Sequence, residues 1–393
     1  MPETNKKSIA QLALRFVLII GIVNLFADFT YEGARSINGA FLASLGASSI
    51  VVGFVAGFGE LIGYALRSVF GFFADKTHKY WVFAFFGYAI NLLAVPALAL
   101  AGNWPVAAAL MIAERTGRAI RKPSMETMLS FTGKELGSGW VFGLNEFLDQ
   151  FGATVGPLVV ALVLFLKGSY KDSYGTLLIS ALVCLAVLVV ARLLFPKPQD
   201  LDKKETTELQ TKGFNKNYWL YVLGGALIAA GFADFSLIAF HFQKTGVVAT
   251  HFIPVLYAVA MAVAGVSSLL FGKLLDKMGF KVTLSAFFLG ALFAPFVFLG
   301  QFWLAFIGMV LWGIGMGAQD SLLKAVLSNM VAKEKRSTAF GLFDTGFGIA
   351  WFLGSAVMGI LYSKSILAVI IFSVLLQLAA LPVFKLATKK ELC

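Results

Sequence analysis

Long apolar stretches, each close to the ~20 residues that a helix needs to cross a lipid bilayer, dominate this chain. Of its 393 residues, 59% are hydrophobic and 13% are charged, whereas soluble domains contain about 25% charged residues. Inside a bilayer the backbone must satisfy its own hydrogen bonds, and a run of this length does so as a helix. The sequence therefore predicts an all-α integral membrane protein.

Twelve stretches are long enough to be membrane-spanning helices. We place them at about 11–42, 48–73, 80–101, 104–122, 137–166, 174–195, 217–243, 251–275, 280–300, 302–328, 338–362 and 366–386. Pro123, directly after the fourth stretch, predicts a break or a kink. A polar segment separates the sixth stretch from the seventh. The predicted organisation is a six-helix bundle over 1–195, a cytoplasmic linker over 196–216 and a second six-helix bundle over 217–393.

The basic residues between these stretches predict an orientation. Nearly all loop lysines and arginines fall on one side, and the other side carries only Lys167, Lys171, Lys244 and Lys364. Because cytoplasmic loops are enriched in Lys and Arg, both termini and the linker are expected in the cytoplasm. The net charge of +11 is thus explained by orientation, and no nucleic-acid partner is expected.

The two predicted bundles are related in sequence. Phe26–Thr30 reads FADFT and Phe232–Ser236 reads FADFS. A second pair of similar segments follows the second stretch of each half, GFFADKTHK at Gly71–Lys79 and GKLLDKMGFK at Gly272–Lys281. Six-helix repeats of this kind are typical of transporters whose halves move about a shared site.

The loop Gly71–Lys79 resembles the G-x-x-x-D-R/K-x-G-R/K-R/K motif of the major facilitator superfamily, with His78 in place of the usual glycine. The resemblance covers essentially the whole chain. It implies twelve helices in two pseudo-symmetric six-helix bundles, and it is strongest to bacterial permeases and proton antiporters. It also implies a conformational latch in the two copies of the motif. The latch residues would be Gly71, Asp75, Lys76, Gly272, Asp276 and Lys277.

The fifth stretch contains GATVGP at Gly152–Pro157, which is similar to the G-x-x-x-G-P motif of family members that export substrate in exchange for protons. Gly152 and Gly156 also form a small face suited to ordinary helix packing. The motif is compatible with either interpretation.

Ionisable residues inside predicted spans are costly, so each is a functional candidate. Burial disfavours the charged form of a carboxylate, which allows such a group to gain and lose a proton. The proton-coupling candidates are Asp28, Glu32, Glu146, Asp149 and Asp234. Cationic, aromatic and polar side chains in the same stretches could bind a substrate. The substrate-binding candidates are Tyr31, Arg35, Arg118, His241, Gln319 and Lys324.

These observations predict a secondary transporter that works by alternating access and exports a small organic molecule with proton coupling. The alternative is a proton- or ion-coupled uptake symporter or exchanger for a charged metabolite, such as an amino acid or a carboxylate. No nucleophile and base set is readable and no Walker A pattern occurs, so neither an enzyme nor an ATP-driven pump is expected. We expect a monomer in a bacterial inner membrane, surrounded by lipid, with no metal and no cofactor beyond a coupling ion, H⁺.

Overall fold

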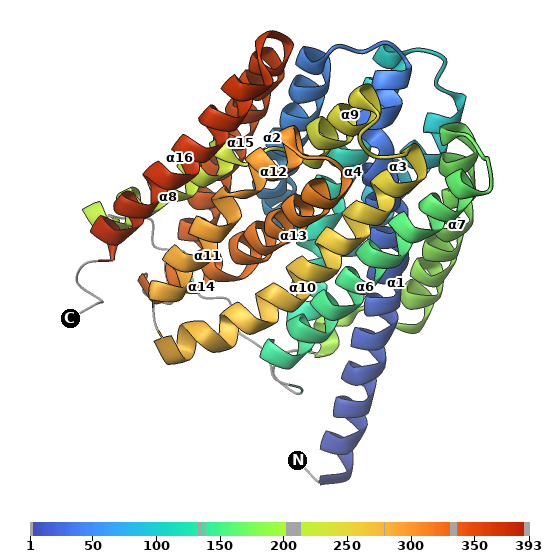
Figure 1. Ribbon diagram of the computed structural model, residues 1–393. Coiled ribbons are helices and arrows are strands. Elements are labelled where there is room, and N and C mark those ends of the chain that lie inside the picture. The colour runs from blue at the N-terminus through green and yellow to red at the C-terminus, as the bar shows by residue number, and fades with distance from the viewer. Residues whose placement is uncertain are drawn as a thin grey trace. The chain divides into compact units, whose positions relative to one another are not determined.

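A computed structural model describes residues 3–132, 136, 138–201, 214–278, 280–330 and 336–388 (Figure 1). These residues form helices and the turns that join them, and no strand occurs among them. The predicted all-α class is therefore confirmed.

The chain divides into two compact units, and the first contains residues 1–34 and 65–206. Two long helices, α1 (Glu3–Ser44) and α2 (Ser49–Thr77), contribute one part to each unit. The other elements of unit 1 are α3 (Tyr80–Ala97), η1 (Leu98–Leu100), α4 (Trp104–Ser130), α6 (Ser138–Phe165), α7 (Tyr170–Leu194) and η2 (Pro198–Leu201).

Unit 2 contains residues 35–64 and 207–393. The parts of α1 and α2 between residues 35 and 64 thus pack with the second half of the chain. The other elements of unit 2 are α8 (Lys216–Gly231), α9 (Phe235–Thr245), η3 (Thr250–Phe252), α10 (Ile253–Met278), α11 (Lys281–Ala291), α12 (Phe293–Leu299), α13 (Phe302–Ala318), the π-helical turn η4 (Gln319–Leu323), α14 (Lys324–Met330), α15 (Arg336–Lys364) and α16 (Ile366–Ala387).

Eleven helical segments of the described residues are long and apolar enough to cross a membrane. Each matches one of the twelve predicted stretches. The remaining stretch lies in α4, whose first part is apolar and whose middle carries several arginines. The sequence predicts a break or a kink at Pro123. Helix α4 continues through Pro123 to Ser130, so the break is absent.

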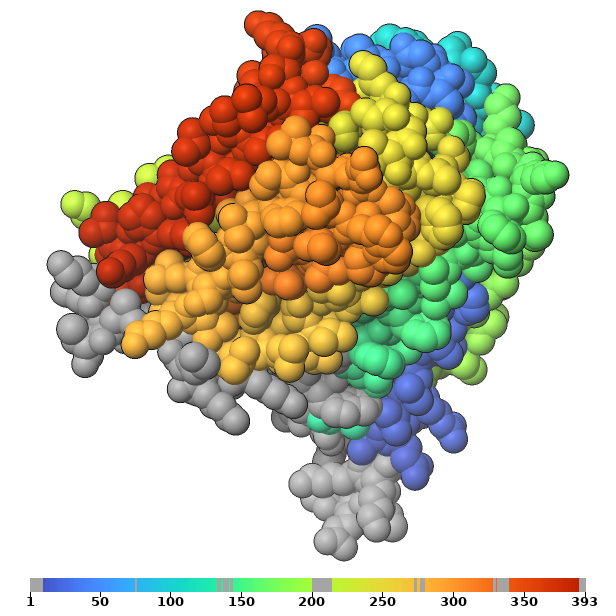
Figure 2. Space-filling model, viewed as in Figure 1, coloured from blue at the N-terminus to red at the C-terminus, as the bar shows by residue number. Residues whose placement is uncertain are grey.

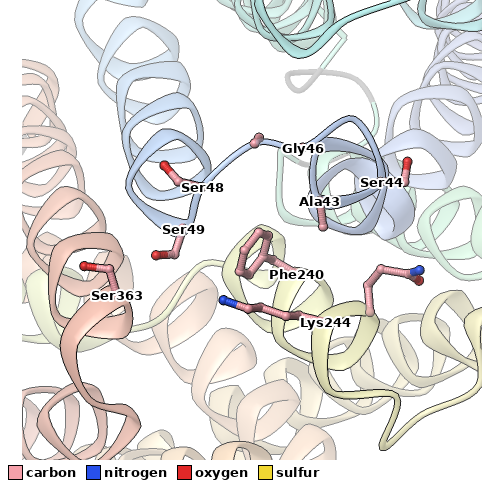
Figure 3. Close-up of a pocket in the computed structure, with 10 residues that line it drawn as sticks. Ala43, Ser44, Gly46, Ser48, Ser49, Phe240, Lys244 and Ser363 are labelled. Atoms are coloured by element: carbon pink, nitrogen blue, oxygen red, sulfur yellow. The ribbon is translucent and has the colours of Figure 1, made fainter.

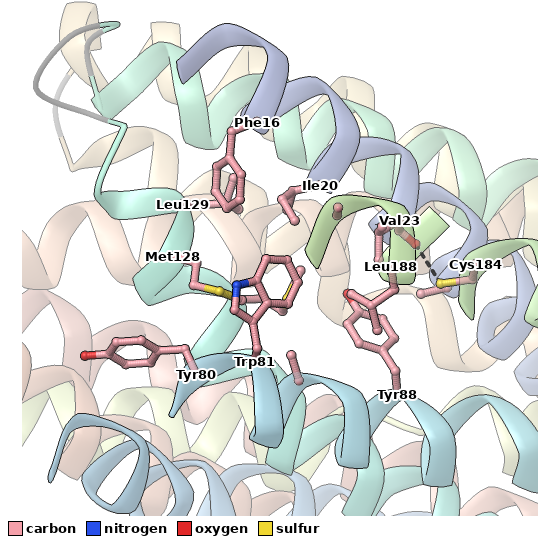
Figure 4. Close-up of a cluster of buried hydrophobic side chains, with 14 of the residues drawn as sticks. Phe16, Ile20, Val23, Tyr80, Trp81, Tyr88, Met128, Leu129, Cys184 and Leu188 are labelled. Carbon is pink, nitrogen blue, oxygen red and sulfur yellow. Dashed lines mark hydrogen bonds between the residues drawn. The ribbon is translucent and has the colours of Figure 1, made fainter. Parts of the chain in front are cut away.

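The core of unit 1 is built from large apolar side chains of α1, α3, α4 and α7 (Figure 4). Two polar side chains of this core donate hydrogen bonds to backbone carbonyls of neighbouring segments. The Trp81 indole N–H donates to the Phe195 carbonyl at 3.1 Å, and the Cys184 thiol donates to the Val23 carbonyl at 3.1 Å. Cys184 is therefore a core residue held between helices.

On the outside of unit 2, by contrast, large apolar side chains are exposed. Trp303 of α13 is 74% exposed, and Ile307, one turn later, is 46% exposed. Figure 2 shows α10 in yellow and α11 to α13 in orange on one face of the space-filling view. An apolar exterior of this kind is expected of helices that contact lipid.

The predicted helix at 217–243 is interrupted in the structure. Helix α8 ends at Gly231, and α9 begins at Phe235 after an extended turn. The interruption leaves backbone carbonyls without helical partners, and side chains replace them. Trp312 donates to the Ala233 carbonyl at 2.9 Å, and Ser373 donates to the Gly231 carbonyl at 2.6 Å. Non-helical backbone at membrane depth is tolerated where protein groups satisfy it in this way.

Candidate functional site

The centre of unit 1 holds a buried ion pair between Asp28 of α1 and Arg121 of α4. The Asp28 Oδ1 and Arg121 Nη2 atoms lie 3.8 Å apart, and both side chains are largely inaccessible. Arg121 has closer contacts with α3 than with Asp28. Its Nε donates to Asn91 Oδ1 at 3.2 Å, and its guanidinium lies 4.4 Å from the Tyr88 ring centroid. The arginine is thus fixed by α3, while the aspartate is held only loosely by the arginine.

Two predicted substrate-binding residues lie together one turn away. The Arg118 guanidinium of α4 is 4.3 Å from the ring centroid of Tyr31, which follows Asp28 by one turn on α1. Such a geometry is a cation–π contact. One turn before Arg118 on α4, Glu114 Oε1 accepts a hydrogen bond from Asn91 Nδ2 at 2.7 Å. Asn91 therefore positions both a carboxylate and an arginine of α4.

A chain of hydrogen bonds links three helices beside this cluster. Tyr88 of α3 donates its hydroxyl proton to Asn24 of α1. Asn24 donates to Asn145 of α6 at 2.7 Å, and Asn145 donates to Asp149 Oδ2 at 3.2 Å. The second carboxylate oxygen of Asp149 is buried and has no hydrogen-bond partner among the described residues. An unsatisfied buried oxygen is a position where a proton or a water molecule would be favoured.

The other carboxylates of unit 1 differ in exposure. Glu32 is 5% exposed, in keeping with its prediction as an internal charge. Glu146 is exposed and accepts a hydrogen bond from Gln150 at 3.2 Å, one turn along its own helix. Neither Glu146 nor Asp149 forms an ion pair with an arginine among the residues that the structure covers.

The glycines of the fifth predicted stretch contact the turn of α1 that carries Asp28. A Cβ atom added at Gly152 would collide with the Leu25 carbonyl, and one added at Gly156 would collide with the Phe29 carbonyl. Because residues 25 and 29 lie on either side of Asp28, the glycine face of α6 brings its backbone directly against this part of α1.

Unit 2 contains a second buried cluster, formed by Arg35, Glu60 and Asp234. Arg35 Nη2 lies 3.2 Å from Glu60 Oε1 and 3.1 Å from Asp234 Oδ2. The three residues come from α1, α2 and the N-terminal cap of α9. Asp234 Oδ1 also accepts a hydrogen bond from the Ser236 N–H at 2.8 Å. Asp234 therefore both caps a helix and balances a buried arginine.

The remaining predicted binding residues of unit 2 lie apart from that cluster. The His241 ring is 2% exposed, and its Nδ1 is 2.9 Å from the Tyr362 hydroxyl. Gln319 begins the π-helical turn and donates to the Gly315 carbonyl at 3.2 Å, while Lys324 is exposed. No group of three or more metal-ligating side chains occurs among the described residues.

The predicted latch is described in part. His78, which replaces the motif's usual glycine, has a φ of 53°. This left-handed conformation favours glycine, so the turn keeps the shape that the motif implies. A Cβ atom at Gly71 would lie 3.4 Å from Pro123 of α4, and Lys76 is exposed. The side chains of Asp75, Asp276 and Lys277, and the surroundings of Gly272, lie outside the described residues.

Sequence reasoning missed Asn24, Tyr88 and Asn91, although they organise the unit 1 cluster. Asparagine and tyrosine carry no charge and therefore did not stand out from the apolar runs. Asn24 and Asn91 are nevertheless amides within predicted spans, and a search for every strong hydrogen-bonding group in those spans would have found them.

Comparisons with known proteins show what this chain is similar to. Residues 222–391 match the family model described as Major Facilitator Superfamily. A protein of Mycobacterium tuberculosis (strain H37Rv) is 38% identical over 375 residues, which cover 94% of this chain and 92% of that protein. An uncharacterized MFS-type transporter of Methanocaldococcus jannaschii is 26% identical over 359 residues and covers 89% of each chain.

The solved structures agree in fold. The crystal structure of the nucleoside transporter NupG superimposes with a TM-score of 0.73 over 94% of this chain and 99% of that one. The two sequences are only 16% identical, so this likeness concerns the fold alone. The predicted arrangement of twelve helices is consistent with it.

Proposed function

Because this chain belongs to the major facilitator superfamily and is a secondary transporter, we propose that it exports a small organic molecule in exchange for protons. One observation carries the proposal. The glycine face of α6, which resembles the motif of proton-driven exporters, packs against the turn of α1 that contains Asp28. The exporter-like motif of α6 thus contacts the turn of α1 that carries an internal carboxylate.

Asp28 is the proton carrier in this proposal. Its only described ion-pair partner is Arg121, at 3.8 Å, which is close to the outer limit for an ion pair. Protonation of Asp28 therefore disrupts little, and Arg121 keeps its contacts with Asn91 and Tyr88. An arginine stays charged at any physiological pH, so it can bind the ionised aspartate in one state and release the neutral one in another.

Asp149 is proposed to take part in the same exchange. It lies at the end of the hydrogen-bonded chain from Tyr88, and one of its oxygens has no described partner. A proton on that oxygen would compensate for burial of the charge. Asp28 and Asp149 would then share one proton-accepting region between α1 and α6.

A thermal-shift screen of the purified protein against metabolites and drugs would identify a substrate, and proteoliposomes would then test coupling. We expect the substrate to move against its gradient when a pH gradient is imposed, and substrate addition to cause a measurable proton flux. Asp28→Asn should abolish both signals. Glu146→Gln is the matched control. It should keep both signals, because this predicted proton-coupling candidate is exposed and forms no ion pair with an arginine among the described residues. Flux in Asp28→Asn that still follows the pH gradient would contradict the proposal.

Uptake of a charged metabolite is the second candidate function. Arg118 supports it, because this residue is only partly buried and its guanidinium is stacked on the Tyr31 ring. A guanidinium held in this way can donate paired hydrogen bonds to a carboxylate. Accumulation of a carboxylate or amino acid inside vesicles, with its loss in Arg118→Gln, would favour this function over export.

A further inference from the structure

A cavity of about 420 Å³ lies in unit 2, at the ends of helices α1, α2, α9 and α15. This size is within the range of about 300–1,000 Å³ typical of small-molecule sites. The cavity is far along α9 from the Arg35 and Asp234 ion pair, since α9 begins beside that pair and the cavity adjoins its last two turns. Its walls are Ala43, Ser44, Gly46, Ala47, Ser48, Ser49, Phe240, Gln243, Lys244 and Ser363.

Lys244 is the single charged residue among these lining residues. Its side chain extends from α9 toward Ser49 and Ser363, beneath the Phe240 ring (Figure 3). The Nζ atom is 5.7 Å from the centroid of Phe240 and 5.8 Å from that of Tyr362. Lys244 forms no ion pair with a residue in the described part of the chain. The cavity therefore offers one positive charge beside an aromatic surface.

Most serines of the cavity offer a ligand a hydrogen-bond acceptor and not a donor. Ser44, Ser49 and Ser363 each donate the hydroxyl proton to a backbone carbonyl, at 2.7, 2.9 and 2.7 Å. Their oxygens can still accept hydrogen bonds from a ligand. Ser48 differs, because its oxygen accepts from the Val51 N–H at 3.3 Å, which leaves the hydroxyl proton for another acceptor.

We propose that this cavity binds a small hydroxycarboxylate. Its carboxylate would pair with the Lys244 ammonium, and its hydroxyl would donate to the oxygens of Ser49 and Ser363, toward which Lys244 extends. A short apolar chain would lie against Phe240. An amino acid fits less well, because its ammonium group would be repelled by Lys244. This site is separate from the unit 1 cluster and does not depend on the direction or coupling of transport.

The ligand would also connect segments that are distant in sequence. Residues 43–49 end α1 and begin α2, whereas Lys244 and Ser363 belong to α9 and α15. A bound hydroxycarboxylate would therefore hold the α1–α2 turn against the second half of the chain within unit 2. Segments 43–50 and 240–246 should both become more protected from hydrogen exchange when it binds.

Binding can be tested on the purified full chain with three probes that share a four-carbon chain: 2-hydroxybutanoate, butanoate and 2-hydroxybutanamide. We expect 2-hydroxybutanoate to bind most tightly, butanoate to bind several-fold more weakly and the neutral amide not to bind. Lys244→Gln should weaken 2-hydroxybutanoate binding about tenfold, which corresponds to about 1.4 kcal/mol. Lys364→Gln is the matched control, since Lys364 is an exposed lysine beside the cavity but not in its lining.

Ser363→Ala distinguishes the contribution of the ligand's hydroxyl to binding from that of its carboxylate. It should reduce the advantage of 2-hydroxybutanoate over butanoate and leave butanoate binding unchanged. Equal binding by the wild type and Lys244→Gln would overturn the proposal. So would binding of the amide as tight as that of the acid, or exchange protection that spares both segments. Because none of these measurements requires transport, their failure is distinguishable from failure of the proposed export function.

Discussion

Replacing Asp234 with asparagine should remove its ion pair with Arg35 and keep the cap that it places on α9. The two carboxylate oxygens have different partners. Oδ2 lies 3.1 Å from Arg35 Nη2, and Oδ1 accepts from the Ser236 N–H at 2.8 Å. An asparagine keeps one acceptor oxygen for the cap but carries no negative charge, whereas alanine keeps neither.

The size of each effect follows from these contacts. At an effective dielectric constant of about 20, two unit charges 3.1 Å apart attract by about 5 kcal/mol, and desolvation offsets part of this. Removing one member of a buried ion pair typically costs about 3–5 kcal/mol. Arg35 keeps Glu60 at 3.2 Å, so we expect Asp234→Asn to lose about 3 kcal/mol of unfolding free energy. Asp234→Ala should lose about 1 kcal/mol more, because the cap is also removed.

Unfolding free energies from SDS titration in mixed micelles would measure both variants, together with Arg35→Gln and the double variant Arg35→Gln/Asp234→Asn. We expect the double variant to be more stable than the sum of the single effects predicts, with a coupling of at least about 1 kcal/mol. Glu146→Gln should change stability by less than about 0.5 kcal/mol. If the effects of Arg35→Gln and Asp234→Asn simply add, the ion pair contributes nothing and the reasoning is refuted.

Three further predictions use the same assay. Gly156→Leu should prevent stable folding, because the side chain meets the backbone of α1. Gly175→Ala should be tolerated, since no atom of another part of the chain lies within 4 Å of an added Cβ there. Equal stability of the two variants would contradict the packing argument. His78→Gly should stabilise the protein by about 1 kcal/mol through relief of a positive φ, and a loss of stability would show that the side chain matters more than the backbone. Trp312→Phe should cost about 1–3 kcal/mol, because it leaves the Ala233 carbonyl unsatisfied; an unchanged unfolding free energy would mean that water satisfies this carbonyl.

The helices and the buried charges could be predicted from the sequence because both are local properties. A run of apolar residues identifies itself as a membrane span without reference to any distant segment. A charged residue within such a run is costly whatever the fold of the rest of the chain. This is why Asp28, Glu32 and Arg35 stood out within α1. All three prove to be buried.

Partners could not be predicted, because they come from distant parts of the sequence. Asn24 bonds to Asn145, 121 positions later, and Arg35 pairs with Asp234, 199 positions later. The interruption before α9 has the same origin. Its carbonyls are satisfied by Trp312 of α13 and by Ser373 of α16, so nothing near residue 233 indicates that an open turn would be tolerated there.

The repeated FADF segment shows how one short sequence acquires two structures. In the first copy Thr30 donates to the Phe26 carbonyl at 2.7 Å within a continuous helix, whereas in the second copy Asp234 ends the extended turn and caps α9. The charge of Asp234 is held by an ion pair at 3.1 Å, whereas that of Asp28 is held by one at 3.8 Å. The two aspartates therefore differ in how closely an arginine holds their negative charge. That difference favours Asp28 as the residue that exchanges protons and Asp234 as a fixed structural charge.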